Sequence, residues 1–191
     1  MKNAVRCILR GKQYPNVAER SVGQALHEIA AKAPADLKAD LRRLRIVSCH
    51  ELPVTGSQKV IVVQVPFMQR TLYRKVQAML ALQIEKKLGG KHIVFVTKRT
   101  IVPKPAMASE YRSRSMTRTN VYEAILHDIV YPANIVGERV RYTPGANQLR
   151  IVLLDNKDKA VFAPKLKSFR AAYKKLTGTD ASFEFPVVDQ E

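Results

Sequence analysis

The fold is decided by Lys59-Val60-Ile61-Val62-Val63-Gln64-Val65-Pro66, which is followed by a helical pattern over residues 67–88 and then by Ile93-Val94-Phe95-Val96. The first run has strand length, is rich in β-branched residues and ends at a proline. A similar run, Ile46 to Val54, precedes it, and Thr55-Gly56-Ser57-Gln58 between the two runs is typical of a hairpin turn. The stretch therefore predicts a hairpin, a helix and a short buried strand.

Helical spacing of apolar residues appears on both sides of this hairpin. Upstream, Ser21 with Gln24 resembles a capping box, and Pro34 ends the predicted helix. A second short helix follows, with Leu37, Leu41 and Leu44 expected to face inward. The stripe downstream of the hairpin consists of Leu72, Val76, Met79, Leu80, Ile84 and Leu88, and Gly89-Gly90 is expected to stop that helix.

The second half of the chain shows the same order of predicted elements. They are a helix at Val121 to Val130, a hairpin of Val136 to Thr143 and Gln148 to Leu154, a helix at Lys165 to Leu176 and a strand at Phe183 and Phe185. Lys86-Lys87-Leu88-Gly89-Gly90 also corresponds to Lys174-Lys175-Leu176-Thr177-Gly178 at an offset of 88 residues. A common helix C-terminus explains that motif alone, but not the repeated order around it.

These patterns predict an α/β (α+β) protein made of two similar α-β-β-α-β halves with antiparallel-rich sheets and a basic connecting arm. The N-terminal half with a basic leader covers residues 1–97, the arm 98–119 and the C-terminal half 120–191. The arm has no apolar period, and a loop of that length suggests either a function or a flexible linker.

The charge is large and uneven. The 191 residues carry a net charge of +17, whereas residues 120–191 hold 10 basic and 9 acidic side chains. The arm holds six cations and one acid, Glu110. An excess confined to the part before residue 120 predicts that one side of the molecule faces a polyanion, with nucleic acid as the first class of partner.

Several chemistries lack their sequence signature. The eight glycines fit neither dinucleotide-binding nor P-loop spacing, and no two lie three apart as a KH clamp requires. The four histidines are far apart, so no metal site or cofactor is expected. Asp155 and Asp158 are better explained by a strand-ending turn than by catalysis. The longest apolar runs are strand-length, well below the roughly 20 residues of a membrane span.

The remaining candidates for function are cations. Arginine forks suit phosphate oxygens, and serine and threonine hydroxyls between them add donors. The predicted RNA-binding residues are Lys98, Arg99, Lys104, Arg112, Arg114 and Arg118 in the arm, and Arg70, Arg74 and Lys75 at the start of the long helix. A solvated linker is the alternative explanation of the arm.

Four strings, in order, resemble one known family. They are residues 90–96 (Gly-Lys-His-Ile-Val-Phe-Val), 98–105 (Lys-Arg-Thr-Ile-Val-Pro-Lys-Pro), 123–128 (Glu-Ala-Ile-Leu-His-Asp) and 173–178 (Tyr-Lys-Lys-Leu-Thr-Gly) with Phe183-Glu184-Phe185-Pro186. Together they resemble the eukaryotic small-subunit ribosomal protein seven (eS-seven) family, and the likeness runs from about Ser21 to Val188.

The resemblance implies a non-catalytic constituent of the cytoplasmic small ribosomal subunit. Its implied partners are 18S rRNA, neighbouring small-subunit proteins and, during a nucleolar stage of rRNA maturation and subunit assembly, assembly factors; no membrane is implied. The family's basic arm corresponds to the six predicted RNA-binding residues between Lys98 and Arg118, although Ala106 to Glu110 replaces a longer Lys/Arg tract. A basic nucleic-acid-processing enzyme and a module that binds acidic proteins are the alternatives.

Overall fold

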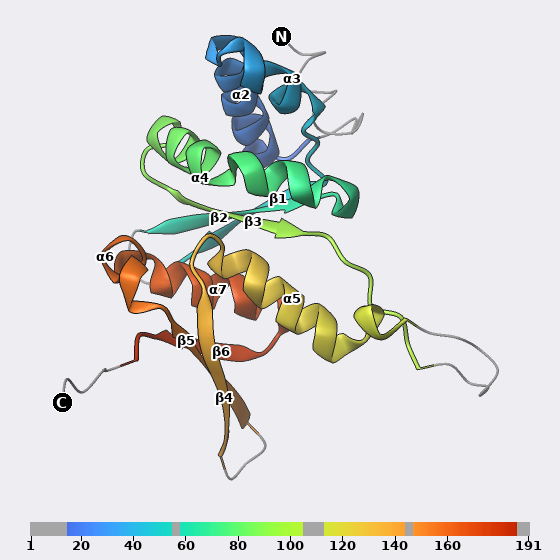
Figure 1. Cartoon of the computed structure of the whole chain (residues 1–191), viewed down its shortest axis with the longest axis vertical. Helices are drawn as coiled ribbons and strands as arrows, with labels where there is room; N and C mark the ends of the chain where they lie inside the picture. The colour runs from blue at the N-terminus through green and yellow to red at the C-terminus, as the bar shows by residue number, and fades with distance from the viewer. Residues whose placement is uncertain (1–14, 55–57, 105–112, 144–146, 187–191) are drawn as a thin grey trace. The chain divides into compact units, whose positions relative to one another are not determined.

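The computed structural model describes residues 15–54, 58–104, 113–143 and 147–186 (Figure 1). The chain divides into two compact units, Met1–Lys98 and Arg99–Glu191. Each unit contains helices and one three-stranded sheet, which confirms the predicted α+β class. The boundary between the units assigns nearly all of the predicted arm to the second unit.

The first unit begins with two helices and then forms a mixed sheet. Its elements are α2 (Val17–Lys32), α3 (Ala35–Arg43), β1 (Ser48–Pro53), β2 (Lys59–Val65), the 3-10 turn η1 (Phe67–Gln69), α4 (Arg70–Lys87) and β3 (His92–Thr97). β1 and β2 pair antiparallel as the predicted hairpin, and β3 pairs parallel to β2. The turn at 55–57 lies outside the described residues.

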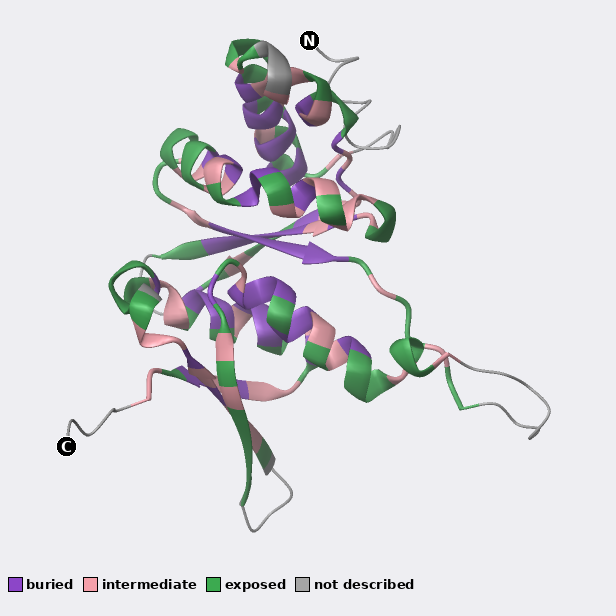
Figure 2. Ribbon diagram, viewed as in Figure 1, coloured by how far each residue is buried: buried purple, intermediate pink, exposed green. Residues whose placement is uncertain are grey.

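Alternation along β2 and β3 directs one row of side chains toward α2 and α4. Ile61, Val63 and Phe95 belong to a single buried cluster with Val22 and Leu80. Figure 2 shows the buried faces of α2 and α4 turned toward the sheet. Helical spacing on α4 and strand alternation thus meet in one core.

Tyr73 belongs to the same core although it was absent from the predicted stripe. Its ring lies 5.6 Å from the ring of Phe95, centroid to centroid, and its hydroxyl donates to the carbonyl oxygen of Arg45 at 2.9 Å. Burial raises the pKa of this phenol above its ordinary value, so it stays a neutral donor. The hydrogen bond ties α4 to the segment between α3 and β1.

The predicted N-cap of the first helix, Ser21, was wrong by five residues. α2 begins at Val17, Asn16 is its N-cap, and Glu19 completes the capping box by accepting from the Asn16 N–H at 2.8 Å. Ser21 lies inside the helix, where its hydroxyl donates to backbone carbonyl oxygens of the preceding turn. Glu19 also accepts from the Cys49 N–H at 3.4 Å, which connects the helix start to β1.

The second unit contains a long hairpin and a helical layer. Its elements are η2 (Arg114–Met116), α5 (Arg118–Val130), β4 (Ile135–Thr143), β5 (Asn147–Leu154), η3 (Asn156–Asp158), α6 (Lys159–Phe162), η4 (Ala163–Lys165), α7 (Leu166–Thr177) and β6 (Asp180–Glu184). β4 pairs antiparallel to β5, and β6 pairs parallel to β5. Residues 144–146 lie outside the description, and the last strand ends one residue before Phe185.

The core of this unit forms between its helices and one face of its sheet. Phe169 of α7 lies between Phe162 and Phe183, with ring centroids 6.0 Å and 5.8 Å away. α5 packs on α7, and α7 packs on β6 (Figure 1). Val152 and Leu154 of β5 are fully buried beside them, so the helices cover the end of the hairpin nearest α5.

Both sheets are mixed, whereas the sequence suggested antiparallel-rich sheets. In each unit a helix connects the second strand to the third, and such a crossover returns the chain parallel. The registers also differ by one position from the offset of 88, because Val60 pairs with His92 but Leu149 pairs with Asp180. Similarity of the two halves therefore stays a prediction.

The repeated Lys-Lys-Leu-x-Gly motif ends a helix in both units. Gly178 has a left-handed φ of 74°, and its N–H donates to the Lys174 carbonyl oxygen at 2.9 Å. After α4 the N–H of Gly90, with φ of 79°, donates to the Glu85 carbonyl oxygen at 2.9 Å. Such turns are a general way of closing helices, so local stereochemistry accounts for the motif.

We expect replacement of Glu19 by alanine to lower the free energy of unfolding by about 2 kcal/mol, because two backbone N–H groups lose their acceptor. Urea denaturation followed by circular dichroism measures the change. Gln24→Ala, at an exposed position of the same helix, is the control and should stay within about 0.5 kcal/mol of the parent. Equal stability of the two variants would contradict the proposed link.

Candidate nucleic-acid interface

The predicted RNA-binding residues of the first unit, Arg70, Arg74, Lys75 and Lys98, follow the ends of two parallel strands. β2 runs through Pro66 and η1 into α4, and the Lys98 N–H donates to the Val65 carbonyl oxygen at 2.8 Å. Lys98 thus lies at the edge of the sheet where α4 begins with Arg70. The first turn of α4 contains no acid, so the positive end of its dipole adds to these cations.

The other predicted residues on this helix differ in exposure. Lys75 is exposed, as is Lys98, whereas Arg70 and Arg74 are half-buried. The exposed pair can meet phosphate without a change of packing. The two arginines also make interactions within the protein, so a structural role competes with a phosphate contact.

The predicted arm is anchored to its own unit at both ends. Arg99 Nη1 donates to Asp128 Oδ2 of α5 at 2.6 Å. Three residues further on, the Val102 N–H donates to the Met116 carbonyl oxygen at 3.1 Å, which draws the segment before residue 103 against η2. The described residues on the two sides of 105–112 therefore contact each other and α5 within the second unit.

Arg99 has a structural role that the sequence analysis did not predict. The side chains of Arg99 and Asp128 are 8% and 6% exposed, so the charges form a buried ion pair. Removing a paired guanidinium from its carboxylate to bind phosphate would leave Asp128 buried and uncompensated. The ion pair gives Arg99 a position on α5 in the fold, and its predicted contact with RNA stays a prediction.

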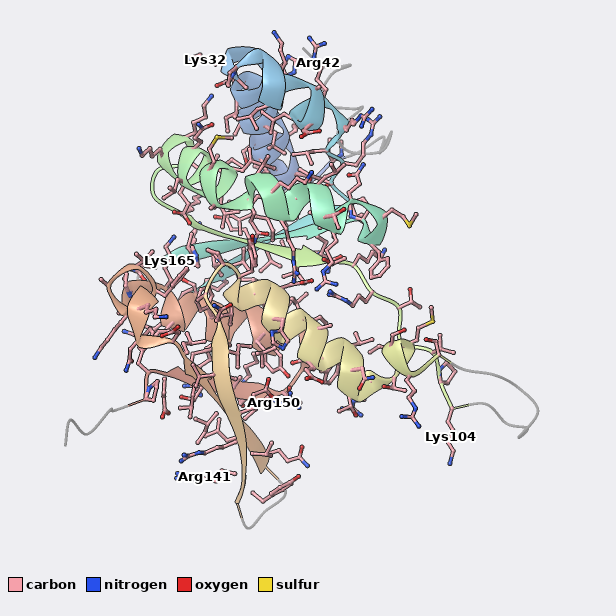
Figure 3. All side chains as sticks on the ribbon, in the orientation of Figure 1. Lys32, Arg42, Lys104, Arg141, Arg150 and Lys165 are labelled. Carbon is pink, nitrogen blue, oxygen red and sulfur yellow. The ribbon has the colours of Figure 1, made fainter. Side chains whose placement is uncertain are left out.

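Lys98 belongs to the first unit. In the part of the predicted arm that belongs to the second unit, three described cations are exposed, and we call Lys104, Arg114 and Arg118 the arm cations. Lys104 projects from the chain before η2 (Figure 3). The Arg114 carbonyl oxygen accepts from Thr117 Oγ1 and from Asn120 Nδ2, each at 2.8 Å, which fixes the turn that presents its side chain. Arg112 lies outside the described residues.

Arg118 is not part of a loop, as the arm boundary at residue 119 implied. It is the first residue of α5, and its guanidinium carbon lies 5.3 Å from the centroid of the Tyr122 ring one turn later. A cation over an aromatic ring stays charged and keeps its outer N–H groups available to solvent. The helix therefore orients this arginine more firmly than a loop would.

Some surface lysines differ from the arm cations because acids neutralise them. Glu51 on β1 meets Lys91 at 2.9 Å and Lys59 at 3.4 Å, and the hydrogen bond from Lys91 contributes most to lowering the pKa of this carboxyl group. Glu28 pairs with Lys87 in the same unit. Among the described residues no acidic side chain forms an ion pair with an arm cation. Their charge is accordingly available to an external anion.

Two further findings concern the described residues alone. Within the described ranges, no group of three or more His, Cys, Asp or Glu side chains is placed to hold a metal ion. None of the described helices is both long and apolar enough to cross a membrane. Asp155 accepts from the Lys157 N–H at 3.1 Å as the cap of η3, which agrees with the predicted turn.

The fold and the exposed cations describe a basic α+β protein with surfaces suited to phosphate. Residues 6–185 match the family model of Ribosomal protein S7e. The chain therefore belongs to the ribosomal protein S7e family, as its resemblance to the eS-seven family predicted. This is a family of ribosomal structural proteins that is not known to be enzymatic, in agreement with the expected non-catalytic role.

Curated relatives cover nearly the whole chain. The chain is 43% identical to small ribosomal subunit protein eS7B of Saccharomyces cerevisiae over 177 residues, which are 91% of this chain and 93% of that protein. It is 43% identical to eS7 of Candida albicans, covering 91% and 94% of the two chains. It is 41% identical to eS7 of Drosophila melanogaster over 186 residues, covering 95% and 94%.

We expect Asp128→Asn to lower the free energy of unfolding by about 3 kcal/mol, because the Arg99 guanidinium stays buried without a negative partner. Chemical denaturation measures the loss. Glu123→Gln makes the same charge change at an exposed position of α5 and should alter stability by less than about 0.5 kcal/mol. The idea fails if the two variants are equally stable.

Proposed function

We propose that this protein is a structural constituent of the small ribosomal subunit that binds 18S rRNA through contacts between Lys or Arg side chains and phosphate. The observation that carries the proposal is the group of exposed arm cations, which have no acidic partner within the described ranges, on a member of the ribosomal protein S7e family. The relatives named above are themselves small ribosomal subunit proteins.

The physical basis of binding is the release of counterions from RNA. Each cation that replaces a condensed counterion at a phosphate adds affinity that falls as salt rises. Lys104, Arg114 and Arg118 provide such contacts in the second unit, and Lys75 and Lys98 provide them in the first. Arg112 stays a candidate on its sequence alone, and Arg70 and Arg74 are secondary candidates because they are half-buried.

Recognition in this proposal depends on RNA shape. Phosphate contacts fix orientation and register but carry no base sequence. A folded rRNA supplies a particular spacing of phosphates. In this proposal the arm cations bind one set of these phosphates, and the cations at the start of α4 bind another. Arg99 contributes by holding the arm on α5 through Asp128 rather than by touching RNA.

The same contacts define the expected place of the protein in the cell. It works in cytoplasmic small subunits beside neighbouring ribosomal proteins. Binding of 18S rRNA by an early-joining protein stabilises local RNA folds, so we also propose a role in subunit assembly and rRNA maturation, with a nucleolar stage and contacts to assembly factors.

In a sedimentation gradient of cell extract, we expect the full-length chain to migrate with small ribosomal subunits at moderate salt and to leave that position after ribonuclease treatment. An antibody or epitope tag follows the chain through the fractions. Recovery only in the slowly sedimenting fractions, with no effect of nuclease, would contradict a ribosomal role.

Replacement of the three arm cations by alanine should weaken binding to an 18S rRNA transcript and lower the magnitude of the salt slope by roughly 2, since each lost phosphate contact removes about 0.7 to 0.9. Filter binding from 50 to 200 mM salt measures both quantities.

The matched control removes three exposed lysines from α6 and α7, namely Lys159, Lys167 and Lys175. It makes the same change in net charge at other positions, so its salt slope should stay near that of the parent. Equal losses in the two variants would show a diffuse charge effect and overturn the assignment to the arm.

A further inference from the structure

The β4–β5 hairpin has an exposed end that the phosphate contacts described so far do not use. β6 pairs with β5 only from Leu149 to Leu153, so the pair formed by Tyr142 and Gln148 lies beyond the last strand. Figure 1 shows β4 and β5 continuing past the helices of their unit as a two-stranded ribbon. No described helix therefore covers the side chains at this end of the ribbon.

One face of the ribbon changes from buried to exposed along its length. Val152 at the covered end is fully buried, Val140 is 44% exposed and Tyr142 is 71% exposed. All three project from the same face, because Val140 pairs with Arg150, and Glu138 with Val152. Figure 2 shows intermediate and exposed residues alternating at the start of β4 and only exposed residues farther along it, as far as Tyr142. A tyrosine ring exposed to this extent contributes little to the core of its own unit.

The opposite face of β4 carries two guanidinium groups. Arg139 and Arg141 alternate with Val140 and Tyr142 and are exposed, and Figure 3 labels Arg141 on this strand. Arg150 on β5 is different, since its Nη1 donates to Glu138 Oε2 at 3.2 Å and its charge is balanced. An exposed ring and two arginines, which form no ion pair with any described acid, thus occupy opposite faces of one edge strand at neighbouring positions.

We propose that the end of this hairpin binds an unpaired segment of RNA, with a base stacked on Tyr142 on one face and the backbone crossing the free edge of β4 to phosphates held by Arg139 and Arg141 on the opposite face. Aromatic rings take up splayed bases of any sequence, and arginines beside them follow the backbone. The inference rests on the proposed function and adds to it a second site with a different ligand chemistry. The arm cations bind phosphates of the RNA backbone, whereas the hairpin also binds a base that is not paired.

A partner protein that adds a strand to β4 fits these features less well. Arg139 and Arg141 both charge the edge, and the register shift between Ile135 and Gly137 disrupts the ladder near its start. Charges and bulges are the usual devices that prevent pairing at an edge strand. Two cations on one face of an edge strand and an exposed ring on the other instead complement a nucleic-acid strand that passes around that edge.

The test compares the full-length chain and its variants on two probes, a single-stranded oligoadenylate 12-mer and an A-form RNA duplex of the same length. Fluorescence anisotropy gives the affinities. Tyr142→Ala should weaken single-strand binding at least fivefold, as expected for the loss of one stacked base, and leave duplex binding within twofold. Tyr142→Phe, which retains the ring, should bind both probes like the parent.

Arg139→Ala combined with Arg141→Ala should weaken binding to both probes and lower the salt slope on the single strand by roughly 1.4. The control Lys159→Ala with Lys167→Ala removes the same charge elsewhere in the unit and should retain the parental slope. Circular dichroism of each variant confirms that the fold is retained, and the Phe variant keeps the test valid if the Ala variant is unstable.

The outcomes separate this inference from the proposed function. If the parent binds RNA and loses affinity on removal of the arm cations, while Tyr142→Ala binds the single strand like the parent, only the hairpin proposal is overturned. If the parent binds neither probe nor 18S rRNA at low salt, both proposals fall. Normal RNA binding by hairpin variants that no longer enter small subunits would assign the hairpin to a protein contact and overturn the RNA assignment.

Discussion

The buried ion pair between Arg99 and Asp128 is the constraint on which the candidate interface depends. It closes a segment of the chain onto α5 immediately after the first unit ends, and the hydrogen bond from Val102 to Met116 continues that closure. With both contacts in place, the arm cations project from a fixed base. Without them the same cations would belong to a free linker, and ordering that linker on RNA would cost conformational entropy.

The pair also shows how this protein divides its charges between two uses. Glu51 and Glu28 hold lysines on the first unit, and Glu138 holds Arg150 on the hairpin. Among the described residues, the arm cations and Arg139 and Arg141 of β4 have no such partner, and several exposed lysines, Lys75 and Lys98 among them, share this property. A net charge of +17 therefore overstates what is available to phosphate, and the distribution of acids decides which cations can bind an external anion.

Much of the fold could be predicted because its signals are local. The hairpin, the helix over residues 67–88 and the glycine stops follow from alternation, helical spacing and turn residues. The start of α2 was missed because two capping boxes compete there, and tertiary contact of Glu19 with Cys49 favours the earlier one. Asp128 could have been found: it falls on the apolar face of its helix, three residues after Ile125, where an acid requires a partner.

The sequence by itself determined the α+β class, the order of helices and strands, the uneven charge and, through ordered strings of residues, the family. These properties depend on neighbours along the chain. Only the tertiary structure decided that the sheets are mixed, that Arg99 is buried while Lys104 is exposed, and that Tyr142 stands beyond the last strand. Pairing direction and the burial of a charged or aromatic side chain depend on segments distant in the chain, which no local pattern specifies.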